Sequence, residues 1–249
     1  MKSLLDLEEK HVLITGGANG IGEAMVREFD QLGALVSFCD VDVNKGKRLQ
    51  KELQHARFTR VDLLKESDVR KWVNDAAAEH NRIDVLINNA AADPRIEFDK
   101  MTSQQWDQLF ARNIKAYFLT TQQARQYFPK SGGSIINFSS ITIHLSPPGM
   151  QAYVATKSAT IGFTQSLARE LGPQNIRVNT LSPGWIMTER QLKEFVTPSV
   201  KRMLKKEQCI PQLIEPEEIA RVAIFLASDL SVAVTGQELL VDRGWAYAG

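Results

Sequence analysis

The chain has 249 residues, of which 43% are hydrophobic, and its formal net charge is +1. This composition is sufficient for one large α/β core, and the near-zero charge argues weakly against nucleic acid or an anionic membrane as the main partner. Cys39 and Cys209 form no CxxC pair, and we find neither a signal peptide nor an apolar run of membrane-spanning length, so we expect reduced thiols and a cytoplasmic location.

Short apolar runs alternate with longer amphipathic segments along the chain. In chain order, the pattern predicts a strand at 11–15, a helix at 21–32, a strand at 34–39, a helix at 44–55, a strand at 58–61, a helix at 66–80, a strand at 83–87, a helix at 103–128, a strand at 133–138, a helix at 152–171, a strand at 176–181, a helix at 217–227 and a strand at 238–241. Strands separated by helices predict one α/β domain, residues 1–249, with a doubly wound parallel sheet of about seven strands. Ligands of such sheets bind at the carboxyl ends of the strands.

The segment 189–211 fits this alternation least well. It is charged, contains Met203 and ends at Pro211. We interpret it as a mobile helical flap over the ligand site, and an ordinary surface insertion is the alternative.

A glycine-rich turn follows the first predicted strand directly. Residues 15–22 read Thr-Gly-Gly-Ala-Asn-Gly-Ile-Gly, and a helix is predicted to begin there. Glycine permits a tight turn and a close backbone approach to a pyrophosphate, while the helix N-terminus offers free N–H groups. The position of this turn after a strand favours a dinucleotide site over a simple turn.

Acidic and amide side chains end the next strands. Asp40 lies about 20 residues beyond the glycine turn, where a carboxylate accepts hydrogen bonds from ribose hydroxyls and repels a 2′-phosphate. We therefore expect NAD rather than NADP, although Lys45 and Arg48 are close enough in sequence to soften that preference. Asp62 and Asn88–Ala90 are placed to hold adenine and ribose, or to cap the strand ends.

Proton chemistry is indicated farther along the chain. Tyr153 and Lys157 are four residues apart and share one helix face. A nearby ammonium lowers the pKa of a phenol, so we expect Tyr153 to act as a base in alcohol oxidation and as an acid in carbonyl reduction. Ser140 is placed to donate to the substrate oxygen. Together with the glycine turn, these residues predict hydride transfer to or from an alcohol carbon.

These motifs resemble the short-chain dehydrogenase/reductase family over essentially the whole chain. Its Thr-Gly-x-x-x-Gly-x-Gly pattern appears at 15–22, its Asn-Asn-Ala motif at 88–90, and its Tyr-x-x-x-Lys pair at 153 and 157, with Ser140 thirteen positions before the tyrosine. Ala91 stands where the family usually has glycine. The resemblance implies a Rossmann fold and a homotetramer formed through the helices predicted at 103–128 and 152–171.

The resemblance also implies roles for individual residues. The expected catalytic residues are Asn113, Ser140, Tyr153 and Lys157; Asn113 would hold a proton-relay water, and Lys157 would also bind the nicotinamide ribose. The expected cofactor-binding residues are Gly16, Asn19, Gly20, Ile21, Gly22, Asp40, Asp62, Leu63, Asn89, Ala90, Tyr153, Lys157, Pro183, Gly184, Ile186 and Thr188.

Several segments are similar to the sugar-oxidising aldose 1-dehydrogenases of this family. They are residues 93–95, 140–145, 188–191, 197–209 and 241–245. This similarity implies a sugar or sugar-acid substrate, contacted by Arg95, Ser140, His144, Tyr153 and Gln191. A surface or capping role is the alternative for each of the polar loop residues, because a polyol pocket needs such groups but so does a solvated loop.

Two other functions were weighed. A reductase of 3-oxoacyl groups or other ketones would use the same scaffold, but Asp40 and the sugar-like loops speak against it. A non-catalytic dinucleotide sensor would be expected to lack Tyr153 or Lys157, and both are present. The four histidines lack metal-ligand spacing, so no metal is expected, and neither a P-loop nor a GxSxG elbow occurs.

Overall fold

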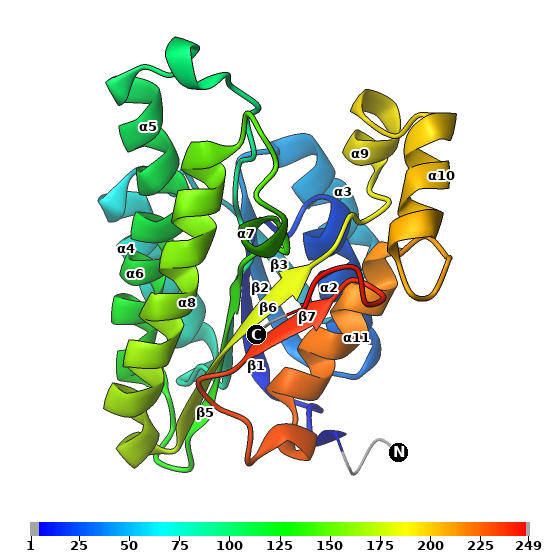
Figure 1. The fold of residues 1–249 in the computed structure, drawn as a ribbon. Helices are drawn as coiled ribbons and strands as arrows, with labels where there is room; N and C mark the ends of the chain where they lie inside the picture. The colour runs from blue at the N-terminus through cyan, green and yellow to red at the C-terminus, as the bar shows by residue number, and fades with distance from the viewer. Residues whose placement is uncertain (1–4, 248–249) are drawn as a thin grey trace.

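A parallel sheet of seven strands lies at the centre of the protein (Figure 1). The structure, a computed structural model, describes residues 5–247. The strand order is β3-β2-β1-β4-β5-β6-β7, so the order reverses between β1 and β4. The strands are β1 (His11–Thr15), β2 (Leu35–Asp40), β3 (Ala56–Arg60), β4 (Val85–Asn88), β5 (Gly133–Phe138), β6 (Ile176–Pro183) and β7 (Glu238–Val241).

Helices cover both faces of this sheet. In Figure 1, α4, α5, α6 and α8 lie on one face, and α2, α3 and α11 lie on the other. The longer helices are α2 (Gly20–Gln31), α3 (Val43–Glu52), α4 (Glu66–His80), α5 (Ser103–Phe110), α6 (Ala116–Ala124), α8 (Gln151–Leu171), α10 (Pro198–Glu207) and α11 (Pro216–Ala227). The short ones are α7 (Thr142–Leu145) and α9 (Glu189–Glu194). The predicted doubly wound fold is confirmed.

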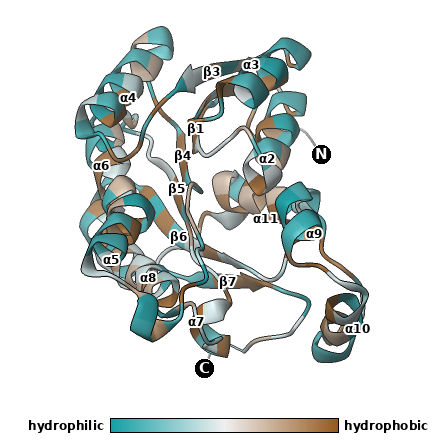
Figure 2. Ribbon diagram, turned by 90° about the horizontal axis from the view of Figure 1, so that it is seen from above, coloured by the Kyte–Doolittle hydropathy of each residue, from teal (hydrophilic) through white to brown (hydrophobic). Residues whose placement is uncertain are grey.

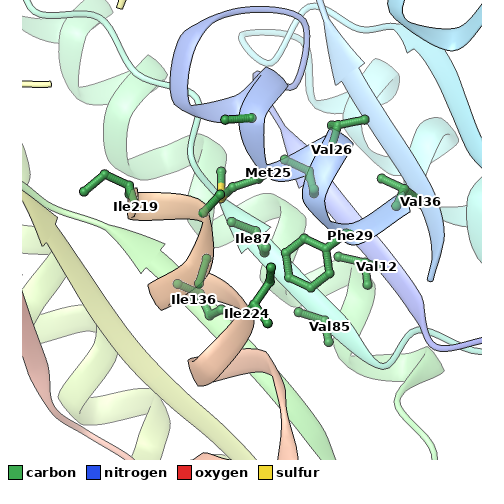
Figure 3. Packing of buried hydrophobic residues seen from close by; sticks show 14 of the residues in the cluster. Val12, Met25, Val26, Phe29, Val36, Val85, Ile87, Ile136, Ile219 and Ile224 are labelled. Carbon is green, nitrogen blue, oxygen red and sulfur yellow. The ribbon is translucent and has the colours of Figure 1, made fainter. Parts of the chain in front are cut away.

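The core explains why the central strands are apolar on both faces. Phe29 of α2 and Ile224 of α11 pack on one side of the sheet against Val12 and Ile87 (Figure 3). A second cluster around Trp72 of α4 fills the opposite side. A parallel sheet buried on both faces needs continuous hydrophobic strands rather than alternating ones, and the central strands β1, β4 and β5 read that way, whereas the edge strand β3 is mostly exposed.

The predicted helix at 103–128 is interrupted. A π-helical stretch, Ala111–Lys115, separates α5 from α6, and a short 3-10 turn, Arg125–Tyr127, follows α6. A π-bulge adds one residue to a turn and changes the face on which later side chains lie, which hydrophobic periodicity does not reveal. The helix α7 was not predicted, because four residues are too few for a periodic signal. Helix α8 matches its prediction within one residue.

The segment predicted as a flap forms two short helices, α9 and α10. Thr188 and Thr197 cap them, since each hydroxyl accepts a hydrogen bond from the backbone N–H three residues later. Both helices lie beyond the carboxyl end of β6 and carry mostly polar residues (Figures 1 and 2). In residues 5–247, the helices are all too short or too polar to cross a bilayer.

Candidate active site

The glycine turn is held in shape by contacts that leave no room for side chains. Gly16 adopts a φ of +67°, and a Cβ atom on Gly22 would lie 1.9 Å from the carbonyl oxygen of Gly16. The Asn89 side chain donates to the carbonyl oxygens of Thr15 and Gly16, both at 3.0 Å. The Thr15 hydroxyl accepts the backbone N–H groups of Asn89 and Ala90. The ends of β1 and β4 are therefore fixed to each other beside the turn.

A cleft of about 880 Å³, here called the glycine cleft, begins at this turn. The start of α2 lines it, and within the described chain no side chain caps that helix, which leaves backbone N–H groups for a pyrophosphate. Asp40 also lines the cleft, and its carboxylate accepts the N–H groups of Ala18 and Asp42, both at 3.1 Å. These residues fit a dinucleotide: a glycine cradle, a free helix terminus and a carboxylate at the expected ribose position.

The predicted cofactor residues gather along two adjoining hollows. The glycine cleft is lined by Gly16, Asn19, Gly20, Ile21, Gly22, Asp40, Asp62, Leu63, Asn89, Ala90, Tyr153 and Thr188. Asp62 lies two residues beyond the end of β3 rather than at the strand end, and its carboxylate accepts the N–H of Leu64. The other four, Lys157, Pro183, Gly184 and Ile186, line the second hollow, a cavity of about 650 Å³ here called the tryptophan cavity because Trp185 and Trp245 line it.

Lys157 is buried inside α8, and its amine faces the end of β5. Its side chain is 1% exposed, and Nζ donates to the carbonyl oxygen of Phe138 at 2.7 Å and to the Tyr117 hydroxyl at 3.3 Å. Nζ lies 5.7 Å from the ring centre of Tyr153. Burial lowers the pKa of Lys157 to about 7, and the Asp93 carboxylate opposes this only in part. Burial therefore disfavours the charged form of this amine.

Tyr153 lies where the glycine cleft meets the tryptophan cavity, since it lines both. Burial raises the pKa of Tyr153 above its ordinary value, and the Asp93 carboxylate raises it further, while the Ser140 hydroxyl and Arg190 act in the opposite direction. The expectation that Lys157 lowers this pKa is thus wrong for the chain by itself. The physical reason is that burial penalises both charged forms, the phenolate and the ammonium that would stabilise it.

Ser140 is 8% exposed and lines the tryptophan cavity beside Tyr153. Its Oγ atom accepts the N–H of Thr142 at 3.2 Å and the Thr142 hydroxyl at 3.0 Å. The Ser140 hydroxyl also faces the Tyr153 phenol, where its hydrogen bond lowers the pKa of Tyr153, so the two hydroxyl groups lie next to each other on the cavity wall. The neighbouring Ser139 instead donates to the backbone of Lys157 at 2.8 Å, so it fastens β5 to α8.

Asn113 lies in the π-helical stretch and is completely buried. Its amide both accepts the N–H of Ala92 and donates to the Ala92 carbonyl oxygen, each at 2.9 Å, and it also donates to the Thr156 hydroxyl. Thr156 belongs to α8 and donates to the carbonyl oxygen of Tyr153. Asn113 therefore joins the loop after β4 to the helix that carries Tyr153. Ala91, where the resembling family has glycine, is not in the left-handed region of φ.

The predicted substrate residues are only partly brought together. Arg95 and Gln191 line the tryptophan cavity with Ser140 and Tyr153. Gln191 accepts a hydrogen bond from the indole N–H of Trp185 at 2.9 Å. His144 does not line this cavity; its Nε2 atom lies 3.1 Å from a carboxylate oxygen of Glu238, which also accepts the Ser182 hydroxyl. His144 thus links α7 to β7 and lies outside the cavity wall, so its position does not support the expected substrate contact.

Sequence reasoning missed much of the cavity wall. Trp185, Trp245, Met203 and Glu207 all line it. Trp245 and Glu207 lie in segments that were compared with sugar dehydrogenases, but nothing in those segments showed which side chains turn inward. The rim carries an ion pair between Asp93 and Arg190, which was also not predicted.

The fold, the glycine turn and the Ser140–Tyr153–Lys157 arrangement define a class of protein, the nicotinamide-dependent oxidoreductases. The chain belongs to the short-chain dehydrogenase/reductase family: residues 16–246 match the family described as Enoyl-(Acyl carrier protein) reductase. A solved double mutant of a short-chain dehydrogenase/reductase from Serratia marcescens is 26% identical, with a TM-score of 0.90 over 97% of this chain and 99% of that one.

Curated relatives are similar over nearly the full length. The chain is 37% identical to the "Probable galactose dehydrogenase" of Rhizobium meliloti over 96% of both chains. It is 36% identical to the D-xylose 1-dehydrogenase of Caulobacter vibrioides, again over 96% of both. It is 34% identical to the 3-oxoacyl-[acyl-carrier-protein] reductase of Chlamydia pneumoniae over 98% of this chain and 99% of that one. The protein is therefore an enzyme that uses a nicotinamide cofactor on a small-molecule substrate.

Proposed function

We propose that the protein oxidises a secondary or anomeric hydroxyl group of a sugar or sugar acid, with NAD as the cofactor. Oxidation at C1 of an aldose gives a lactone. The observation that carries the proposal is the position of Tyr153, which lies where a dinucleotide cleft meets a cavity lined by Arg95, Gln191 and two tryptophans. Two of the similar curated relatives, at 37% and 36% identity, are named for galactose and D-xylose.

The proposed chemistry divides between the cofactor and this chain. When bound, the nicotinamide accepts the hydride from the substrate carbon and, in its oxidised form, brings positive charge toward the site. Tyr153 removes the hydroxyl proton, and Ser140 donates to the substrate oxygen and holds it beside the phenol. Lys157 binds the ribose and stabilises the phenolate. Asn113 holds α8 in position against the loop after β4 through its hydrogen bonds to Ala92 and Thr156.

The preference for NAD rests on Asp40 and on the pairing of nearby cations. Lys45 donates to Glu189 at 3.0 Å, and Arg48 lies within 4 Å of Glu23 and Glu52. These contacts place acidic side chains beside both cations, which weakens their ability to offset Asp40 beside a 2′-phosphate. A carboxylate held by two backbone N–H groups is well placed to accept ribose hydroxyls and to repel NADP.

NADH absorbance measured with purified enzyme, NAD and a panel of pentoses, hexoses and sugar acids tests the proposal. We expect at least one aldose to be oxidised, and we expect Tyr153→Phe to lose turnover while still binding NAD. Absence of NADH with the whole panel would sink the sugar assignment. Faster turnover of acetoacetyl thioesters with NADPH would favour a ketone reductase instead, and the similarity to the 3-oxoacyl reductase of Chlamydia pneumoniae is the observation behind that alternative.

We also propose that four copies assemble in the cytoplasm and that 189–211 closes over the bound ligands. Trp106 of α5 and Phe118 of α6 are large apolar side chains, 37% and 44% exposed, on helices expected at the subunit interface. Light scattering of the purified protein tests the assembly. Limited proteolysis with and without NAD tests the flap, because closure should protect this segment from cleavage.

A further inference from the structure

Arg95 is an exposed cation on the wall of the tryptophan cavity, and it packs against two aromatic rings. Its guanidinium lies 3.8 Å from the ring centre of Phe195 and 5.5 Å from that of Trp185. Among residues 5–247, it has neither a carboxylate within 4 Å nor a hydrogen bond to the protein. A guanidinium stacked on a ring keeps its N–H edge free, so Arg95 offers a fixed fork of donors to a ligand.

Glu207 is an acceptor on the wall of the same cavity. It is the last residue of α10, where a carboxylate opposes the helix dipole and the neighbouring Lys205 and Lys206 would be preferred. In the part of the chain that is described, it forms neither an ion pair nor a hydrogen bond. Glu207 is exposed, and its place on the cavity wall leaves its carboxylate available to accept a hydrogen bond from a ligand.

Four acidic or basic side chains line the cavity: Asp93, Arg95, Lys157 and Glu207. Asp93 is paired with Arg190, and the amine of Lys157 donates to the Phe138 carbonyl oxygen. Of these four side chains, Arg95 and Glu207 are therefore the two that have no ion pair or hydrogen bond among residues 5–247. Arg95 can donate hydrogen bonds to a ligand, and Glu207 can accept them.

We propose that the substrate is an uncharged polyol ring, with Arg95 donating to one hydroxyl and Glu207 accepting from another. This inference rests on the proposed function and settles the choice that it leaves open, between a neutral sugar and a sugar acid. A hydroxyl group both donates and accepts, so one neutral sugar satisfies both side chains. A carboxylate would satisfy Arg95 alone and would meet repulsion from Glu207 and Asp93.

The two tryptophans support the same substrate. Trp185 and Trp245 line the cavity with Pro147, Pro148 and Met150, so part of the wall is apolar. A pyranose or furanose ring has a face of C–H groups that packs on such a surface, while its hydroxyls reach the polar groups at the rim.

The test compares matched neutral and acidic sugars. D-galactose and D-galacturonate differ in the group at C6, as do D-glucose and D-glucuronate. We expect kcat/KM with NAD to favour the neutral member of the better pair at least tenfold. Glu207→Gln should reduce that preference at least fivefold, and Arg95→Met should raise KM for the neutral sugar about tenfold with little change in kcat. Glu170→Gln, which removes an exposed carboxylate from the last turn of α8 outside the cavity, should change neither value.

Quenching of tryptophan fluorescence gives a second readout that does not depend on turnover, because Trp185 and Trp245 line the cavity. A sugar acid that binds and reacts as well as its neutral counterpart, or an unchanged preference in Glu207→Gln, would overturn the inference. Neutral sugars that quench in a Glu207-dependent way but yield no NADH would contradict the proposed function and leave the polyol site standing. Glu207→Gln removes an unfavourable charge from a helix end, so its folding is not at risk.

Discussion

The buried amine of Lys157 should make the stability of this enzyme depend on pH. Burial lowers the pKa of Lys157 from 10.5 to about 7. Between those two values the unfolded chain holds a proton that the folded chain lacks, so the free energy of unfolding rises with pH across this window. At ~1.4 kcal/mol per pH unit, the full rise is about 5 kcal/mol. Below about pH 7, Lys157 is protonated in both the folded and the unfolded chain, so its unfavourable effect on the free energy of unfolding stays constant.

Lys157→Met isolates this effect because it removes the ionisable group and approximately keeps the volume. The variant also loses the hydrogen bond to the Phe138 carbonyl oxygen, which adds an offset that does not depend on pH. Urea unfolding from pH 6 to pH 10 measures the difference in free energy of unfolding between variant and wild type. We expect the advantage of the variant to decrease by about 3–4 kcal/mol between pH 7 and pH 10. Lys51→Met, at an exposed position of α3, is the control and should show a flat difference.

A difference for Lys157→Met that is equally flat would refute the reasoning. It would mean that the amine keeps an ordinary pKa in the folded protein, and that Tyr153 is influenced by a fully charged lysine without the cofactor. The pH dependence of stability therefore also reports on the electrostatics of the proposed catalytic pair.

Three further predictions concern the glycine cleft and its rim. Gly22→Ala should destabilise the fold by roughly 2–4 kcal/mol, because the added Cβ would meet backbone atoms, and calorimetry should detect no NAD binding. Gly172→Ala is the control: its Cβ would enter open space at a φ of −54°, so this variant should be neutral or slightly stabilising. Asp40→Ser should raise kcat/KM for NADP relative to NAD at least tenfold, and an unchanged ratio would remove the argument for NAD. Asp93→Asn should move the Tyr153-dependent limb of the pH–rate profile to lower pH, since Asp93 raises that pKa.

The sequence determined the fold class and the chemical motifs of this protein. Apolar strands alternating with amphipathic helices leave few alternatives to a parallel sheet covered on both faces, because right-handed crossovers are strongly preferred. The glycine turn could be located because glycine is the residue that tolerates its backbone geometry and close contacts. Tyr153 and Lys157 could be paired because four residues bring side chains to one face of a helix.

Tertiary structure decided what local patterns do not encode. Whether Arg95 and Glu207 line one cavity, and whether His144 contacts Glu238 instead, depends on the packing of segments far apart in sequence. The π-helical stretch around Asn113 depends on contacts with Ala92 and α8 rather than on hydrophobic period. The pKa of Lys157 was also hidden, because spacing reveals a neighbouring charge but burial is a property of the assembled core.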